Sequence, residues 1–237
     1  MPSSKFEYQA GDLAAVGHLA VPSSPGPHGA VLVCHEGPGQ DDHVRGRADR
    51  IADELGFVAL ALDYHGGAAI LGPDAYLARL LELRDDYEQL LTVARAGLEA
   101  LVGQPSVDTG RVAAIGYCFG GTMALELARA GADLRATVGL HSGLEMSEAG
   151  SSSSISGRVL VAVGDADPLI PQEHVDAFRD DMSASGVDCT VEIYPGAGHS
   201  FTNAAADAWG VPGIAYDEAA DLASWDSMAA FLRDTIG

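Results

Sequence analysis

The chain has 237 residues, a length sufficient for one α/β domain that buries a substantial core. Thirteen basic residues against 34 acidic ones give a formal charge of −21 at pH 7. This balance argues against nucleic acid or an anionic membrane as a partner, because both recruit patches of lysine and arginine. The N-terminal residues lack the apolar core of a secretory signal, and every apolar run is far shorter than a bilayer span, so we expect a cytoplasmic enzyme without membrane contact.

The three cysteines are an odd number, and they stand far apart at Cys34, Cys118 and Cys189. No Cys-x-x-Cys spacing occurs, so neither a disulfide framework nor a thiolate zinc site is predicted. At least one thiol must be free.

The first expected element is an antiparallel hairpin at the N-terminus, with 17–22 as one of its strands. Short apolar runs rich in Val, Ile and Ala then alternate with longer amphipathic stretches. In chain order we expect a strand at 30–36, a helix at 42–55, a strand at 57–64, a helix at 74–100, a strand at 111–118, a helix at 119–129, strands at 136–142 and 158–164, a helix at 171–185, a strand at 189–195 and a helix at 219–235. Continuous apolar runs suit strands that are buried on both faces. The prediction is an α/β fold with a mostly parallel sheet and helices on both of its faces.

Two segments of low complexity, 22–29 and 150–157, are rich in serine, glycine or proline. The alternation of strands and helices continues on both sides of each segment, which favours surface loops over linkers. We therefore expect residues 1–237 to form a single domain.

Polar side chains follow the expected parallel strands, and function in open α/β sheets concentrates at the edge where such strands end. These residues are Glu36, Tyr64, His65, Cys118, His141, Asp165, Asp167 and His199. A thiol, a carboxylate and an imidazole thus follow one another along the chain as Cys118, Asp167 and His199. Covalent catalysis by an activated thiol requires this set of groups.

The segment AIGYCFGGT (114–122) lies between an expected strand and an expected helix. Its pattern Gly116-x-Cys118-x-Gly120 is typical of a nucleophile elbow, in which small flanking residues allow a strained turn to hold the nucleophile at a helix N-terminus. The N–H of Phe119 would then be available to an oxyanion. The alternative is a buried core cysteine beside a glycine turn, which would make the elbow pattern and the order of its partners a coincidence.

Four segments resemble motifs of the dienelactone hydrolases, which are α/β-hydrolases with a Cys-Asp-His triad. The segments are HEGPG (35–39), GYCFGG (116–121), GDADPLIP (164–171) and AGHSF (197–201), and the resemblance runs from about residue 17 to the C-terminus. It implies the α/β-hydrolase fold and hydrolysis of an ester or lactone, without a cofactor.

The resemblance also implies a role for each motif residue. These roles are nucleophile for Cys118, general base for His199, orienting acid for Asp167, and oxyanion-hole amides from Phe119 and Gly37. Asp165 competes for the acid role, but the family pattern places the acid directly before a proline, as Asp167 stands before Pro168. Asp165 is then expected to be a turn residue.

Glu36 matches a family glutamate that lies close to the thiol and takes part in generating the thiolate. A nearby carboxylate disfavours a second negative charge. Our hypothesis is that Glu36 keeps Cys118 protonated at rest and accepts its proton when substrate binds. The alternative is a glutamate that only caps the loop.

The segment HEGPGQDDH (35–43) also invites a metal site. However, its histidine and acidic side chains alternate around one loop, whereas a metal needs ligands that converge from several elements. Asp41 or Asp42 as a helix N-cap explains the acidic pair better, so we expect no metal.

The substrate prediction follows from a departure from the family pattern. Dienelactone hydrolases that act on carboxylated lactones bind the substrate carboxylate with arginines. This chain has Asn203 shortly after His199 and no arginine directly after Tyr64. We therefore expect a neutral pocket for neutral esters or lactones with good leaving groups, and phosphotriesters as a side activity. Candidate substrate contacts are Tyr64, His65, His141, Asn203 and Trp209, with Tyr216 as a further pocket residue.

Other functions are compatible with the same residues. A thioesterase or peptidase would keep the triad, and a non-enzymatic receptor would bind a small ester without turnover. If Cys118 is a redox-sensing thiol, peroxide should oxidise it far faster than an ordinary thiol. The intact triad argues against the receptor. A homodimer is compatible with the sequence, although no specific signal points to one.

Overall fold

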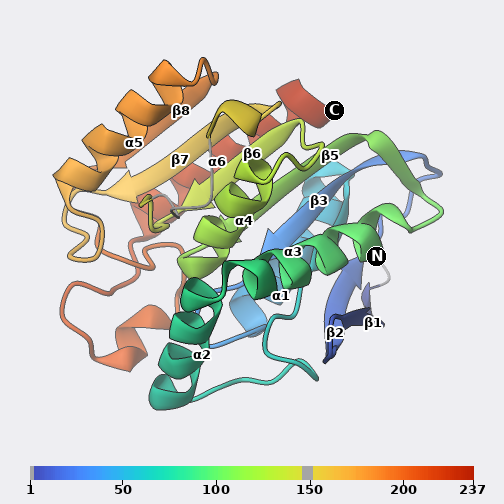
Figure 1. The fold of residues 1–237 in the computed structure, drawn as a ribbon, viewed down its shortest axis with the longest axis horizontal. Coiled ribbons are helices and arrows are strands. Elements are labelled where there is room, and N and C mark those ends of the chain that lie inside the picture. Colours follow the sequence, from blue (N-terminus) through green and yellow to red (C-terminus); the bar gives the residue numbers. More distant parts are fainter. Residues whose placement is uncertain (1–2, 146–151) are drawn as a thin grey trace.

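A sheet of eight strands forms the centre of the computed structural model, which describes residues 3–145 and 152–237 (Figure 1). The strands are β1 (Ser3–Ala10), β2 (Leu13–Ala20), β3 (His28–Cys34), β4 (Val58–Ala61), β5 (Val107–Tyr117), β6 (Ala136–Leu140), β7 (Arg158–Gly164) and β8 (Cys189–Tyr194). Their order across the sheet is β1-β2-β4-β3-β5-β6-β7-β8. β1 and β2 form the predicted antiparallel hairpin, β2 is also antiparallel to β4, and the remaining neighbours are parallel.

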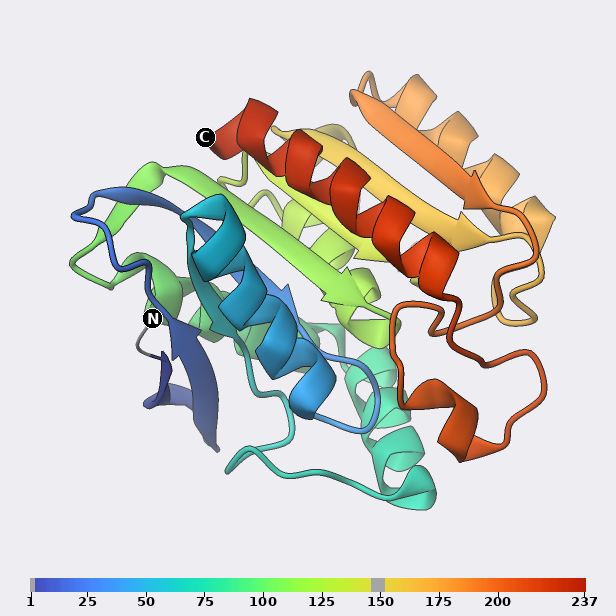
Figure 2. The ribbon, with the colours of Figure 1, turned by 180° about the vertical axis from the view of Figure 1, so that it is seen from behind.

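Helices cover both faces of this sheet. They are α1 (Asp42–Arg50), α2 (Pro73–Asp85), α3 (Tyr87–Val102), α4 (Phe119–Arg129), α5 (Gln172–Ala184) and α6 (Glu218–Ile236). α3, α4 and α5 lie on the face seen in Figure 1, and α1 and α6 lie on the opposite face seen in Figure 2. The predicted α/β class, with a mostly parallel sheet between two helical layers, is confirmed.

The central strands are apolar along their whole length because both of their faces contact helices. Every residue of β3, β4 and β6 is buried. Successive side chains of a strand point to opposite faces. Val31 and Val33 accordingly share a cluster with Leu232 of α6, while Leu32 between them shares a cluster with Ala94 of α3.

The prediction of one helix at 74–100 is wrong, because the chain forms α2 and α3 with a break at Asp86. The backbone of Asp86 leaves the helical region at φ −114° and ψ 85°, and its side chain accepts a hydrogen bond from the Gln89 N–H at 3.0 Å. Asp86 therefore ends α2 and is the N-cap of α3. In Figure 1 the two helices run in clearly different directions. The apolar periodicity continues across the break, which is why periodicity alone predicts a single helix.

Smaller differences occur at other boundaries. The regular part of the helix predicted at 42–55 ends at Arg50, and a π-helical turn, Ile51–Leu55, completes it before Gly56 at φ 75°. In the segment 150–157, a short 3-10 turn occupies Ser152–Ser154, while residues 150 and 151 lie outside the described part. Among the residues that the structure describes, no helix is long and apolar enough to cross a membrane.

The topology brings the predicted triad to one edge of the sheet. β5, β7 and β8 run in the same direction, and Cys118, Asp167 and His199 follow their carboxyl ends. Loops that leave parallel strands at this edge form the usual location of a site in an α/β fold.

Candidate active site

Cys118 occupies a sharp turn between β5 and α4. Its backbone has φ 53° and ψ −123°, a conformation that costs a residue with a side chain about 1–3 kcal/mol. The Cys118 N–H holds the turn by donating to the Leu140 oxygen at 3.0 Å and to Nδ1 of His141 at 3.2 Å. The side chain is half-buried. The turn thus places the thiol at the N-terminus of α4.

The glycines around Cys118 are required because backbone segments approach each other closely there. A Cβ atom on Gly116 would lie 2.1 Å from the Gly120 oxygen, and a Cβ atom on Gly120 would lie 2.3 Å from the Cys34 oxygen. Backbone atoms cannot move away as a flexible side chain could, so only glycine fits at either position. The first turn of α4 is consequently packed against the end of β3.

His199 and Asp167 are buried and joined by a hydrogen bond of 2.8 Å between Nδ1 and Oδ2. The other oxygen of Asp167 accepts from the Leu169 N–H at 2.8 Å, which fixes the carboxylate. Asp165, the competing aspartate, is exposed and accepts from the Gly196 N–H at 2.6 Å. Of the two aspartates, the structure brings Asp167 to the imidazole.

The second ring nitrogen of His199, Nε2, is buried and has no hydrogen-bond partner of ordinary geometry among the described residues. Burial by itself lowers the pKa of His199. The charge of the neighbouring Cys118 thiolate and the hydrogen bond to Asp167 outweigh burial, so the pKa of His199 lies well above its usual value. This environment stabilises an imidazolium next to the Cys118 thiolate, the ion pair from which the thiolate can attack.

The two amides predicted to face an oxyanion come from different elements. Phe119 is the first residue of α4, a position at which the N–H has no acceptor within the helix. Gly37 is buried in the loop after β3, and a Cβ atom there would lie 2.9 Å from the ring of Tyr76. Phe119 lines the same cavity as Cys118.

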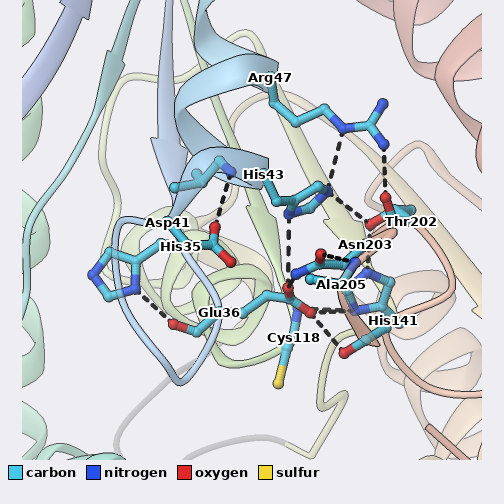
Figure 3. A network of polar contacts seen from close by, with 12 residues as sticks. His35, Glu36, Asp41, His43, Arg47, Cys118, His141, Thr202, Asn203 and Ala205 are labelled. Carbon is cyan, nitrogen blue, oxygen red and sulfur yellow. Dashed lines mark hydrogen bonds and ion pairs between the residues drawn. The ribbon is translucent and has the colours of Figure 1, made fainter. Parts of the chain in front are cut away.

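The carboxylate of Glu36 belongs to a buried polar network (Figure 3). It accepts hydrogen bonds from Oγ of Ser200 at 2.6 Å and from Nδ2 of Asn203 at 2.5 Å, and Nδ1 of His43 lies 3.6 Å away. Burial raises the pKa of Glu36, and the two hydrogen bonds oppose this rise. In Figure 3 the sulfur of Cys118 points away from the carboxylate, so the two groups can meet only if the cysteine side chain rotates.

Two buried histidines extend this network. Burial lowers the pKa of His43 to about 3 and the pKa of His141 well below its usual value, so both rings are neutral. Because the Cys118 N–H donates to Nδ1 of His141, the ring proton of His141 is on Nε2, which donates to Oγ1 of Thr202 at 2.8 Å. His141 thereby connects the elbow to the loop that follows His199.

A cavity of about 680 Å³ lies beside the elbow, a volume that suits a small organic molecule. The described residues that line it are Leu80, Arg84, Asp85, Tyr87, Leu90, Cys118, Phe119, Thr122, Glu126, Gly143, Glu145, Leu169, Ile170 and His199. The expectation of a neutral pocket therefore needs correction, since Arg84 of α2 contributes one cation and Asp85, Glu126 and Glu145 contribute carboxylates. Glu126 is paired with Arg129 at 2.6 Å. If Glu126 is counted as neutralised by Arg129, the charged groups that remain are Arg84, Asp85 and Glu145. Together these three side chains carry no net positive charge.

The five predicted substrate contacts are absent from the described wall of this cavity. They are Tyr64, His65, His141, Asn203 and Trp209. The first four are hydrogen-bonded to other protein groups, and Trp209 is half-buried in a 3-10 turn, Ala206–Trp209. Much of the actual wall comes from α2 and α3, which sequence reasoning treated as one helix. The signal that could have divided them is the pair Asp86 and Gln89, three residues apart as in a helix N-terminus.

The segment that invited a metal site is explained by local hydrogen bonds. Asp41 is the N-cap of α1, and its side chain accepts from the Val44 N–H at 3.2 Å. Nδ1 of His35 bonds to the Glu36 carbonyl oxygen. Within the described ranges, no group of three His, Cys, Asp or Glu side chains is placed to hold a metal ion.

The model of the Dienelactone hydrolase family matches residues 16–236. The chain belongs to this family. Dienelactone hydrolases act on ester or lactone bonds, and the protein is accordingly an ester or lactone hydrolase. Among solved structures, a dienelactone hydrolase-like promiscuous phosphotriesterase from metagenomic libraries is 38% identical, with 100% of this chain and 99% of that chain covered and a TM-score of 0.96.

Two further similar proteins are less identical to this chain. A protein of Bradyrhizobium sp named "Probable 2-oxo-3-(5-oxofuran-2-ylidene)propanoate lactonase" is 29% identical, and the match covers 91% of this chain and 88% of that protein. The crystal structure of a dienelactone hydrolase from Anabaena variabilis is 18% identical with a TM-score of 0.73, over 100% of this chain and 99% of that one. At that identity the likeness shows the shared fold alone.

Proposed function

We propose that this dienelactone hydrolase family member hydrolyses neutral carboxylic esters or lactones through an acyl-cysteine intermediate. The observation that carries the proposal is the position of Cys118 and His199 on the wall of one cavity, with Asp167 bound to the far ring nitrogen of His199. A nucleophile, a base and a group that orients the base are the parts that covalent acyl transfer needs.

In the acylation step, the thiolate of Cys118 attacks the carbonyl carbon, and the π electrons of the C=O bond move to its oxygen. The N–H groups of Phe119 and Gly37 stabilise this oxyanion. The tetrahedral intermediate collapses, and the leaving alkoxide takes the proton of the His199 imidazolium. In deacylation His199 removes a proton from water, the resulting hydroxide attacks the thioester, and Cys118 leaves as thiolate. The net reaction converts ester and water into acid and alcohol.

The charges around the cavity support a neutral substrate. Among the described residues of the wall, Asp85 and Glu145 oppose the cation Arg84, and the His199 imidazolium is balanced by the Cys118 thiolate; the whole chain carries a formal charge of −21. An anionic substrate would meet an unfavourable potential on approach and no excess of positive charge inside. The thiolate adds a second restriction, because it is itself a good leaving group and returns to substrate unless the alcohol leaves easily. Enol and aryl esters meet both conditions.

We also propose that Glu36 disfavours the resting thiolate of Cys118, accepts its proton after the cysteine side chain rotates, and returns it to the thiolate that deacylation releases. His199 stays protonated during this transfer and serves the leaving alkoxide. Ser200 and Asn203 hold the carboxylate in place for this role. The variant Glu36→Gln should then react faster with iodoacetamide than wild type at pH 7. Glu192→Gln is a matched control, because Glu192 also accepts two hydrogen bonds, in its case from hydroxyl groups away from the cavity. Equal alkylation rates in Glu36→Gln and wild type would contradict this part of the mechanism.

The decisive experiment for the acyl-enzyme is a stopped-flow record of nitrophenolate release from p-nitrophenyl acetate. Wild type should give a burst of about one equivalent per active site followed by slower turnover. The burst should vanish in Cys118→Ala and persist in Cys189→Ala, which removes another free thiol. Equal progress curves for wild type and Cys118→Ala would show that Cys118 is structural.

Phosphotriesters form a second candidate class of substrate. The support is the similarity, at 38% identity over the whole chain, to a promiscuous phosphotriesterase. Attack of Cys118 at phosphorus would place negative charge on a non-bridging oxygen, where the same amides can stabilise it. His199 would then have to activate water to release the phosphoryl group from sulfur. Paraoxon turnover in wild type and its loss in Cys118→Ala would support the proposal, whereas intact ester hydrolysis with no paraoxon turnover would remove it.

A further inference from the structure

The carbonyl oxygen of Glu36 is held by two fully buried aromatic side chains. The hydroxyl of Tyr64 donates to this oxygen at 2.8 Å, with the His35 oxygen as a weaker second acceptor at 3.2 Å. Nδ1 of His35 donates to the Glu36 oxygen at 2.6 Å, and the Gly39 N–H adds a longer contact of 3.2 Å (Figure 3 shows the contact from His35). The two rings stack on each other with their centroids 3.7 Å apart and their planes 20° from parallel. The nitrogen of the same peptide unit belongs to Gly37, one of the two amides assigned to the oxyanion.

A trans peptide unit is planar, and its C=O and N–H bonds point in opposite directions. Fixing the oxygen of Glu36 therefore fixes the direction of the Gly37 N–H. The following peptide unit is anchored as well, because Nε2 of His65 donates to the Gly37 oxygen at 2.8 Å. The ring of Tyr76 packs against Gly37 on another side and leaves no room for a Cβ atom there.

The protonation states suit this role. Burial raises the pKa of Tyr64 well above its usual value, so the hydroxyl keeps its proton and remains a donor. Burial likewise lowers the pKa of His35, so the ring is neutral. Its proton is on Nδ1, which faces a carbonyl, and Nε2 is left to accept from the Tyr64 N–H at 3.4 Å. Hydrogen bonds accepted by a carbonyl oxygen polarise its peptide unit and strengthen the N–H at the other end as a donor.

We infer that Tyr64 is a positioning residue for the oxyanion hole, whose hydroxyl acts through the Glu36 carbonyl to fix and polarise the Gly37 N–H. The inference rests on the proposed function, because an oxyanion forms only if Cys118 attacks a carbonyl group. It also gives Tyr64 a role different from the substrate contact predicted from the sequence, since the side chain lies behind the amide and is fully buried.

The test compares Tyr64→Phe with Tyr117→Phe in two reactions of Cys118. Both tyrosines are almost completely buried, but the Tyr117 hydroxyl has no hydrogen-bond partner among the described residues, so its removal controls for the loss of a buried hydroxyl. Acylation by p-nitrophenyl acetate passes through an oxyanion, whereas alkylation by iodoacetamide displaces iodide and does not. The two reactions share the thiolate and differ in their need for the Gly37 N–H.

We expect Tyr64→Phe to lower the acylation rate constant by about 10- to 100-fold, somewhat less than the loss of a complete oxyanion donor. Alkylation should stay within about twofold of wild type. The substrate concentration that half-saturates the burst rate should change little, because an interaction made only in the transition state affects the rate and not substrate binding. Tyr117→Phe should resemble wild type in both reactions.

A second measurement does not depend on turnover. A trifluoromethyl ketone forms a tetrahedral adduct when the thiolate adds to its carbonyl carbon and the oxygen takes the negative charge. Its affinity should fall in Tyr64→Phe by about the same factor as the acylation rate constant.

Several results would overturn the inference. If the acylation and alkylation rate constants of Tyr64→Phe fell equally, the substitution would act on Cys118 and His199 and not on the oxyanion hole. If acylation were unchanged, the Tyr64 hydroxyl would contribute only to packing. A wild-type enzyme that shows no acylation of Cys118 would refute the proposed function and this inference with it. By contrast, normal acylation in wild type and an unaffected Tyr64→Phe would refute the inference alone.

Discussion

Arg47 of α1 and Asp221 of α6 form a buried ion pair, and removal of one partner gives a prediction of large magnitude. Nη2 of Arg47 lies 2.5 Å from Oδ1 of Asp221 and 2.8 Å from the Thr202 oxygen, and each charged side chain is only 10% exposed. In Arg47→Met the carboxylate would retain the Tyr216 hydroxyl, at 3.3 Å, as its partner among the described residues. A buried charge would be left without its counter-ion.

The size of the effect follows from this geometry. Removing one partner of a buried pair costs about 3–5 kcal/mol, whereas replacing both with apolar side chains is often neutral. We therefore expect Arg47→Met to lower the free energy of unfolding by about 3–5 kcal/mol at pH 8, and Arg47→Met/Asp221→Leu to recover most of this loss. Burial raises the pKa of Asp221, so the folded state binds more protons than the unfolded state as pH falls. The loss in Arg47→Met should accordingly shrink between pH 8 and pH 5.

Urea unfolding followed by circular dichroism measures these free energies. Arg179→Met is the matched control, because Arg179 and its partner Asp176 are 43% and 62% exposed, and an exposed pair is worth at most about 1 kcal/mol. A loss below about 1 kcal/mol in Arg47→Met at pH 8 would mean that solvent or another group compensates Asp221, and would refute the assignment of a buried pair. A loss independent of pH would contradict the raised pKa of Asp221.

Three further predictions concern the site and its surroundings. Gly120→Ala should lower the free energy of unfolding by about 3 kcal/mol or more in urea titrations, because its Cβ would lie 2.3 Å from the Cys34 oxygen; a stable variant would show that the elbow can relax. Asp167→Asn should reduce kcat for p-nitrophenyl acetate by a factor on the order of 10³, since His199 loses its orienting charge, whereas Asp165→Asn should not; similar losses in both would contradict the assigned acid. His43 has a folded-state pKa of about 3, so between pH 5 and 6 the unfolded state binds more protons and stability falls as pH falls. In His43→Asn this slope should decrease by up to about 1.4 kcal/mol per pH unit in urea titrations at several pH values, and an unchanged slope would show that His43 titrates normally.

Local sequence patterns predicted the parts of this molecule that depend on local physics. Continuous apolar runs identified the strands because burial on both faces requires them. The glycine pattern around Cys118 predicted a strained turn, and the backbone contacts of Gly116 and Gly120 supply the steric reason. A carboxylate beside His199 could be anticipated because both follow parallel strands of one sheet, and the family resemblance pointed to Asp167 in place of Asp165.

The direction of individual side chains could not be predicted in the same way. Tyr64 follows β4 and Asn203 follows His199, close to the site in sequence. Tertiary packing nevertheless directs the Tyr64 hydroxyl to the Glu36 carbonyl oxygen and the Asn203 amide to the Glu36 carboxylate. Arg84 of α2 and Tyr87 of α3 line the same cavity on either side of the break at Asp86, and the apolar period continues through that point. Such outcomes depend on contacts between distant segments, which hydrophobic periodicity does not encode.

The reactive groups and the selective surface come from different stretches of the chain. Cys118, Asp167 and His199 are anchored to the sheet, whereas a large part of the cavity wall belongs to α2 and α3, inserted between β4 and β5. Substitutions at Leu80 or Arg84 can therefore alter which esters enter while the bond-breaking machinery stays as it is. In evolutionary terms α2 can vary more freely than α3, because Leu83 is its one buried residue whereas α3 packs on the sheet, and α2 offers a compact target for libraries that seek new substrates.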